Sequence, residues 1–293
     1  MFQSFPVNYV QPLFRPPSEA RSLIFQVTNG CSWNRCTYCD MYTEPQKKFR
    51  PRDPDELLAE IRACAQSGVE PRRVFLADGD ALVLSMRRLR IILEEIRACF
   101  PSLQRVSSYC LPSNLKNKSD EDLLGLGLIY VGAESGDDRV LRQVDKGETH
   151  ASTVESLLRA RAAGIKTSVM ILNGLGGRAL SESHARESAR LVNETQPDYL
   201  ATLVLTFYTD RKRFEAGFDG FEELDTVGLC REMRGFIEAT ELDSTIFRSD
   251  HVSNHLVMKG VLGRDRQRLL ARIDEAIAFF QQHPDFERGH VGY

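Results

Sequence analysis

The 293-residue chain lacks several features that mark membrane, secreted or nucleic-acid-binding proteins. No apolar stretch reaches the roughly 20 residues that a membrane-spanning helix needs, so no membrane association is expected. Met1–Pro6 shows no basic region followed by an apolar core, and we therefore expect no secretory signal. The formal net charge is −3, and no basic tail or RNA-binding module is evident, which argues against nucleic acid as a partner.

Cysteine is scarce as well, and neither internal repeats nor low-complexity tracts are evident. Seven cysteines in 293 residues are too few for a disulfide-stapled scaffold, and their odd number leaves one unpaired. We therefore expect free thiols in a reducing compartment, the cytoplasm. Apolar residues make up 42% and charged residues 27% of the chain, as in globular proteins that bury a large core.

Short apolar runs rich in β-branched residues alternate with amphipathic helical patterns. Strands are predicted at 22–28, 73–77, 105–110, 128–133, 166–172, 199–205 and 244–247. Helices are predicted from Asp53-Pro54 onward, from Ser119 onward, and over 86–99, 151–163, 183–193, 225–239 and 265–281. Strands that alternate with helices favour parallel βα units. The sequence therefore predicts an α/β fold, with six such units in an open or partial barrel.

Three of the seven cysteines, Cys31, Cys36 and Cys39, lie within nine residues directly after the first predicted strand. Three thiolates on one short loop can converge on a soft metal centre. A [4Fe–4S] cluster usually takes four thiolates, so three leave one iron open for another ligand, an arrangement that suits catalysis. Structural zinc with a fourth ligand from elsewhere is the alternative, although no His or Cys follows at zinc-finger spacing.

The segment from Thr28 to Tyr42 resembles the cluster loop of radical S-adenosylmethionine (radical SAM) enzymes. That superfamily usually has the spacing C-x3-C-x2-C with an aromatic residue before the third cysteine. Here the spacing is C-x4-C-x2-C, and Tyr38 keeps the aromatic position. The resemblance is narrower still to a bacterial subfamily with this longer gap, related to coproporphyrinogen-oxidase-like and Elongator-like proteins.

The resemblance implies a partial (β/α)6 TIM-like barrel over 22–208. An extended N-terminal lead-in over 1–21 would precede it, and a C-terminal extension over 209–293 would close the substrate side. The implied cofactors are a [4Fe–4S] cluster on the three cysteines and SAM at the open iron. Reductive cleavage of SAM would give a 5′-deoxyadenosyl radical that takes hydrogen from a substrate. A small-molecule substrate and an electron donor such as flavodoxin or ferredoxin are the implied partners.

Further SAM-binding residues follow from the same resemblance, at the ends of later strands. Asp78, Gly79 and Asp80 stand where the family carries a Gly-Gly-Glu-like stretch that holds the SAM amino group. Glu134 and Ser135 match a Gly-x-Glu-Ser segment that contacts the ribose or the amino group. The other candidates, for a carboxylate and for adenine, are Lys146, Ser168, Gly174 and Phe207. Ordinary structural roles are the alternative for each: a tight turn, a solvated lysine or core packing.

Polar side chains gather in 247–255, after the last predicted strand. Because polar groups are costly to bury without partners, Arg248, His251 and Asn254 are candidates for substrate contacts. Arg248 suits a carboxylate or a phosphate, since its planar fork binds such groups bidentately. Cys110 ends the third predicted strand and is a candidate for hydrogen relay or substrate binding. An exposed loop and a small apolar filler are the respective alternatives.

Several functions remain open at this level. A radical SAM enzyme is the first. Its tetrapyrrole- or tRNA-modifying variants rest on family analogy alone. A non-catalytic iron–sulfur or haem carrier would need the cysteines but not the glycines and carboxylates of the later strands. A zinc-stabilised binding module is the last.

Overall fold

The structure is a computed structural model that describes residues 6–116, 118, 119, 123, 125–207, 210–284 and 286. The chain forms two compact units. The first unit consists of 1–34, 39–131 and 159–166, and the second of 35–38, 132–158 and 167–293. These units cut across the segments 1–21, 22–208 and 209–293 predicted from the sequence, and those boundaries stay a prediction.

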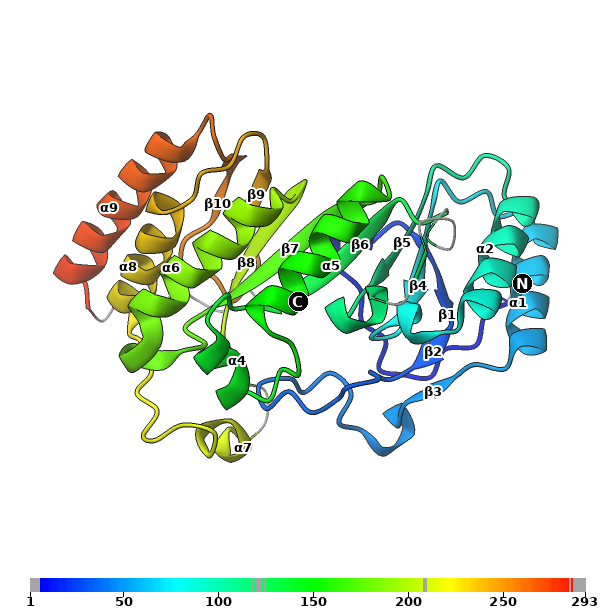
Figure 1. Ribbon diagram of the computed structural model, residues 1–293, viewed down its shortest axis with the longest axis horizontal. Coiled ribbons are helices and arrows are strands. Elements are labelled where there is room, and N and C mark those ends of the chain that lie inside the picture. Colours follow the sequence, from blue (N-terminus) through cyan, green and yellow to red (C-terminus); the bar gives the residue numbers. More distant parts are fainter. Residues whose placement is uncertain are drawn as a thin grey trace. The chain divides into compact units, whose positions relative to one another are not determined.

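A parallel sheet forms the centre of the first unit (Figure 1). Its strands lie side by side in the order β1 (Leu23–Gln26), β4 (Arg73–Ala77), β5 (Arg105–Tyr109) and β6 (Leu128–Glu134), the last of which continues into the second unit. Two residues after β1, the short strand β2 (Thr28–Asn29) pairs with β3 (Arg50–Pro51) in antiparallel fashion. The cysteine loop therefore starts at the carboxyl end of a parallel strand, where functional groups gather in such folds.

Two helices, α1 (Pro54–Gln66) and α2 (Met86–Cys99), pack against each other outside this sheet (Figure 1). Their buried stripes include Leu57 and Ile61 on α1 and Leu89 and Ile96 on α2, which is the 3.6-residue periodicity seen in the sequence. Short 3₁₀ turns connect the remaining parts of the unit: η1 (Pro17–Glu19), η2 (Pro45–Lys47), η3 (Ala81–Val83) and η4 (Pro112–Leu115).

The N-terminal segment packs into the first unit. Tyr9 and Leu13 lie against a cluster formed by Ile24, Phe75 and Ala77. The Tyr9 hydroxyl donates to the main-chain carbonyl of Ile24 at 3.0 Å. The sequence suggested a lead-in that only crosses the surface, but these residues contribute to the core beside the sheet.

The second unit also contains a sheet covered by helices (Figure 1). Strands β7 (Lys166–Asn173), β8 (Tyr199–Val204) and β9 (Ile246–Ser249) are parallel, and β10 (Met258–Val261) pairs with β9 in antiparallel fashion. Helix α8 (Thr226–Glu238) packs between α6 (Gly177–Thr195) and α9 (Arg266–Gln282). The shorter helices are α4 (Asp138–Gln143), α5 (His150–Ala162) and α7 (Lys212–Glu215).

An apolar cluster in the second unit lies beneath the loops that follow β7 and β8. It is formed by the buried residues Val140, Val144, Leu172, Leu175, Leu205 and Phe214. Because these residues come from α4, β7, α7 and the connecting loops, the cluster fixes the loops at the carboxyl ends of the strands. Those loops carry several of the predicted site residues.

The seven predicted strands occur with ends shifted by a few residues at most, and β4 has the predicted bounds. Strand β10 has no counterpart in the prediction, and α6 begins at Gly177 rather than at position 183. The short helix predicted from Ser119 lies largely outside the described residues. In the part of the chain that the structure describes, none of the helices combines the length and apolarity needed to span a bilayer.

Asp53 caps the N-terminus of α1, and its removal tests how this helix is held. Its carboxylate accepts from the main-chain amides of Asp55 and Glu56, at 3.0 and 3.1 Å. Loss of such a cap costs about 1 kcal/mol. We expect Asp53→Ala to lower the urea midpoint by a corresponding amount, whereas Glu70→Ala, at an exposed position, should leave it unchanged. Equal midpoints for Asp53→Ala and the parent protein would contradict the capping role.

Candidate cofactor-binding site

In the first unit, the start of the cysteine loop is held by a buried carboxylate. Asp78, fully buried after β4, accepts through Oδ2 from the main-chain amide of Gly30 at 3.0 Å and from Gln26 Nε2 at 2.8 Å. Lys47, also fully buried, forms an ion pair with the same oxygen and donates to the carbonyl of Val10 at 2.9 Å. Oδ2 of Asp78 thus anchors the loop, while Oδ1 is buried with no hydrogen-bond donor among the described residues. The SAM contact predicted for Asp78 from the sequence therefore stays a prediction.

Gly79 lies against the first cysteine. A Cβ atom at this position would stand 2.9 Å from Cys31 Cβ and 2.9 Å from the ring of Tyr42. Any larger residue would therefore displace the cysteine loop. The main-chain amide of Gly79 donates to the carbonyl of Gly30 at 3.2 Å, so this glycine fixes the loop by close packing.

Asp80, which stands in the place of the family's glutamate, is fully buried beside the same loop. Ser32 Oγ donates to Oδ2 at 3.3 Å, and Asn114 Nδ2 donates to the same oxygen. The other oxygen accepts from the amide of Leu82 at 3.1 Å and caps η3. Burial raises the pKa of Asp80 to about 7, against the lowering effect of these hydrogen bonds.

All seven cysteines are free thiols. Cys31 and Cys39 belong to the first unit and are partly exposed, while Cys36 belongs to the second and is buried. Within the described ranges, no three or more His, Cys, Asp or Glu side chains stand close enough to hold a metal ion. Assignment of the three thiols to a cluster therefore depends on their spacing and on the family. Cys110 is buried, with its sulfur 3.3 Å from the carbonyl of Leu111.

In the second unit, the cysteine-loop segment 35–38 is docked against α4 and α7. The amide of Thr37 donates to the carbonyl of Val144 at 2.9 Å, just after α4. From α7, the guanidinium of Arg213 donates to the carbonyl of Cys36. Both contacts use main-chain atoms of the loop, so they fix its path.

Glu134, Lys146 and Tyr38 come together in the second unit. Glu134 has φ +64°, and its carboxylate folds back over Gly132, where a Cβ would lie 2.1 Å from Oε1. Lys146 Nζ lies 3.4 Å from that oxygen and 3.2 Å from the Tyr38 hydroxyl. The side chain of Lys146 is 6% exposed, so it is not the solvated lysine that the sequence also allowed.

The second oxygen of Glu134 shows whether this site can accommodate SAM. Oε2 is buried, and no hydrogen-bond donor reaches it from the described residues. A buried carboxylate oxygen without a donor is costly, because its desolvation is not offset. An ammonium or hydroxyl group bound there would satisfy it. The methionine and ribose parts of SAM carry such groups, so Glu134 fits the cofactor.

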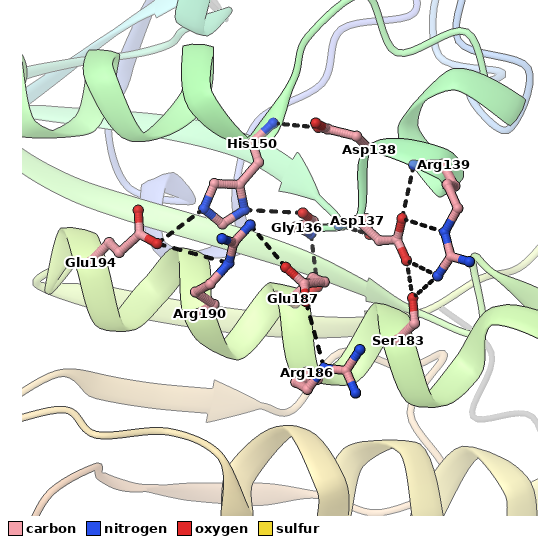
Figure 2. Close-up of polar contacts among 12 residues, drawn as sticks. Gly136, Asp137, Asp138, Arg139, His150, Ser183, Arg186, Glu187, Arg190 and Glu194 are labelled. Carbon is pink, nitrogen blue, oxygen red and sulfur yellow. Dashed lines mark hydrogen bonds and ion pairs between the residues drawn. The ribbon is translucent and has the colours of Figure 1, made fainter.

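The loop after β6 is fixed on α6 by main-chain contacts (Figure 2). The amide of Gly136 donates to Ser188 Oγ at 2.9 Å, and its carbonyl lies 3.0 Å from His150 Nδ1. A Cβ at Gly136 would stand 2.1 Å from the carbonyl of Glu187, so the loop touches the helix backbone directly. Glu134 therefore sits at the root of a loop with little freedom to move.

Asp137 extends this attachment (Figure 2). It caps α4 by accepting from the amide of Arg139 at 2.8 Å, and it pairs with the Arg139 guanidinium at 2.9 Å. Ser183 Oγ, on α6, also donates to it. Burial acts to raise the pKa of Asp137, but the bonds from Arg139 and Ser183 prevail and lower it to about 2. The carboxylate therefore stays ionised throughout the range in which proteins are handled.

Other predicted SAM-binding residues occupy separate places in the second unit. Gly174, with φ +84°, follows β7, and its amide donates to Glu232 Oε1 at 2.6 Å. Ser168 is half-buried within β7. Phe207 packs against Phe214 with a centroid distance of 5.0 Å, which is the core packing that the sequence allowed as an alternative.

The predicted substrate residues belong to one segment but differ in exposure. Arg248 is exposed on β9, whereas Asn254 is buried and donates to the carbonyl of Thr202 at 2.8 Å. The side-chain nitrogen of Asn254 therefore holds its loop to β8. His251 Nδ1 lies 2.8 Å from Ser253 Oγ, and burial lowers the pKa of this imidazole.

Sequence reasoning missed Lys47, Asn114, His184 and Glu232. Each is buried or half-buried and bonded to a loop that carries a predicted site residue. Their partners lie 31 to 58 residues away along the chain, so no local motif connects them. Only the fold brings them to the strand ends.

Comparison with known proteins identifies the family of this chain. A model of the radical SAM superfamily matches residues 25–192, which is more than half of the chain. The chain is 22% identical over 241 residues to a putative methylthiotransferase of Methanocaldococcus jannaschii, covering 76% of this chain and 48% of that protein. It is 26% identical over 220 residues to a tRNA-2-methylthio-N(6)-dimethylallyladenosine synthase of Acidithiobacillus ferrooxidans, covering 70% and 43%. The chain thus spans less than half of the length of these two relatives.

Among solved structures, the coproporphyrinogen III oxidase of Escherichia coli, itself a radical SAM enzyme, is similar with a TM-score of 0.58. The match covers 75% of this chain and 54% of that one, at 17% sequence identity. Such a likeness establishes the fold class, the α/β partial (β/α)6 barrel predicted from the sequence. Together with the family match over residues 25–192, it shows that the chain belongs to the radical SAM superfamily, enzymes that use a [4Fe–4S] cluster and S-adenosylmethionine.

Proposed function

We propose that this enzyme reductively cleaves SAM at a [4Fe–4S] cluster held by Cys31, Cys36 and Cys39. The observation that carries the proposal is the buried Glu134 carboxylate, with one oxygen unsatisfied, beside Tyr38 of the cysteine loop. A non-catalytic cluster carrier has no need for a buried carboxylate at this place. Zinc binding would leave the Glu134 site without an explanation.

The bound cluster would supply one electron to the sulfonium of SAM, so that the C5′–S bond breaks and methionine leaves. The resulting 5′-deoxyadenosyl radical would take a hydrogen atom from substrate. An external donor of low potential, of the flavodoxin or ferredoxin class, must return the electron. The free state of all seven cysteines is compatible with a reducing compartment such as the cytoplasm, which we propose as the location.

The residues of the second unit would bind and orient SAM. Glu134 Oε2 would accept from the ammonium or a ribose hydroxyl. Lys146 would neutralise the charge on Oε1 and hold the Tyr38 hydroxyl, so that the cysteine loop and the Glu134 loop keep a fixed spacing. In the first unit, Asp78 and Gly79 act on the loop by anchoring and packing, and Asp80 holds Ser32, next to the first cysteine.

For the substrate, we propose a small molecule with an anionic group. Arg248 and Lys259 are directly opposite each other on β9 and β10, so they share one face of the sheet. Two cations in such a pair repel each other unless an anion lies between them. Lys259 pairs with Asp250 at 2.8 Å, while Arg248 has no ion pair with any described residue. The neighbouring Ile246 is 39% exposed and offers apolar surface to the rest of the molecule.

A tRNA-modifying activity is the second candidate, because a relative of 26% identity is named for that reaction on tRNA. The net charge of −3 favours the small molecule. A tetrapyrrole substrate would carry carboxylates and would also suit Arg248.

The cysteine assignment predicts the behaviour of Cys36→Ala. After anaerobic reconstitution we expect iron and sulfide to fall to background, because two thiolates cannot hold the cluster. Circular dichroism should stay unchanged, since the carbonyl of Cys36 and the amide of Thr37 keep their bonds in the variant. Cys99→Ala, a partly exposed cysteine on α2, is the control and should keep full iron content. Normal iron in Cys36→Ala would overturn the ligand set.

The Glu134 assignment predicts weaker SAM binding in Glu134→Gln. Removal of a hydrogen bond to a charged group costs about 1.5–3 kcal/mol, or roughly a 10- to 100-fold rise in the SAM dissociation constant. Equilibrium dialysis of the reconstituted protein measures it. Iron content should not change, and Glu155→Gln, on the exposed side of α5, should bind SAM normally. An unaltered affinity would remove Glu134 from the site.

The anion proposal predicts that a phosphate or carboxylate ion shields Arg248 from phenylglyoxal. Mass spectrometry should show slower modification of Arg248 in millimolar phosphate or butyrate, and Lys259→Ala should reduce that protection. Arg161, exposed on α5, is the internal control and should react equally in both conditions. Equal rates at Arg248 with and without the anions would contradict an anionic subsite.

A further inference from the structure

A single buried carboxylate on α8 contacts the loop after β7 directly and reaches the loop after β6 through His184. Glu232, whose side chain is 1% exposed, accepts through Oε1 from the amide of Gly174 at 2.6 Å. Its Oε2 accepts from Ser181 Oγ at 2.7 Å. His184 Nε2 lies 3.8 Å from Oε1, longer than a hydrogen bond, so the ring packs beside the carboxylate.

The contact with the loop after β6 runs through His184. Its Nδ1 lies 2.8 Å from Ser135 Oγ, next to Glu134 in the chain. Ser135 Oγ also accepts from the amide of Asp137 at 3.0 Å, so its own hydrogen is free to point at Nδ1. Nδ1 then accepts, and the other ring nitrogen carries the hydrogen and points toward Glu232.

We propose that Glu232 is a positioning residue that couples the two SAM-binding loops. It touches neither the cysteines nor the Glu134 carboxylate, and it acts through Gly174 on one side and through His184 and Ser135 on the other. This inference deepens the proposed function, on which its SAM-binding consequence rests. The coupling itself is a property of the chain without cofactor.

Both loops depend on the Glu232 carboxylate. Oε1 accepts from the Gly174 amide and lies beside the His184 ring, and Oε2 accepts from the Ser181 hydroxyl. A glutamine can reproduce these contacts, because its oxygen can replace Oε1 and its NH₂ group can donate to the Ser181 hydroxyl. A leucine of similar size has no acceptor, so Glu232→Leu removes the contacts to both loops at once.

The exchange of main-chain amides with deuterium reports the coupling in the absence of cofactor. We expect Glu232→Leu to accelerate exchange in both 134–138 and 174–181. Glu238→Leu, on the exposed side of α8, is the matched control and should exchange as the parent protein does. Acceleration confined to 174–181 would overturn the coupling, because no effect would then pass through His184 to the loop after β6.

The reconstituted enzyme reports the consequence for SAM. We expect Glu232→Leu to raise the SAM dissociation constant and the KM for SAM by roughly 10-fold, since lost positioning weakens binding before chemistry. Iron content and the kcat for 5′-deoxyadenosine formation should stay within about threefold of the parent. An unchanged KM would overturn the positioning role. A parent protein that binds no SAM would defeat the proposed function and leave the exchange result standing.

A second variant keeps the test valid where Glu232→Leu fails to fold. Ser135→Ala removes only the far end of the relay and makes no contact with the loop after β7. We expect it to accelerate exchange in 174–181 as well as in 134–138. Exchange that changes around Ser135 alone would show that no coupling passes through His184 to Glu232.

Discussion

Buried carboxylates that accept from loop amides are the interaction on which the candidate site depends. In the first unit Asp78 holds the amide of Gly30, and in the second Glu232 holds that of Gly174. Charge-assisted bonds of this kind are about twice as strong as neutral ones. A buried carboxylate is costly unless every donor around it is aligned, so the loop can adopt few other conformations. Loops at strand ends thereby become as ordered as the strands that carry them.

Glu134 differs from these anchoring carboxylates in one respect. Among the described residues, Asp78 meets three donors at Oδ2 and none at Oδ1, and Glu232 has a donor at each oxygen. Glu134 has one donor, Lys146 at Oε1, and none at Oε2. An unsatisfied buried oxygen is tolerated where a ligand completes it. The anchors and the binding carboxylate are therefore distinguished by how much of their bonding capacity the protein itself uses.

The fold was largely predictable because its signals are local. Alternating apolar runs and a capping sequence such as Asp53-Pro54 mark strands and helices without reference to distant residues. Site residues that lie in a recognisable sequence motif, such as Glu134, were predictable. It was not predictable at Lys47, which lies in a short turn beside a second lysine and gives no sign that it is buried. Asp78 has a role that its motif did not indicate, since Oδ2 anchors the cysteine loop, and the SAM contact suggested by the motif stays a prediction.

The longer first gap of the cysteine loop has a physical explanation in the path of its residues. Asn34 has φ +46°, a left-handed conformation that asparagine tolerates better than most residues. Its side-chain amide donates to the carbonyl of Tyr42 at 3.0 Å and so closes the loop onto its own far end. A left-handed residue reverses the chain locally, and this is a way to take up an added position without lengthening the path between the flanking cysteines. The departure from C-x3-C-x2-C is thus compatible with the same three ligands.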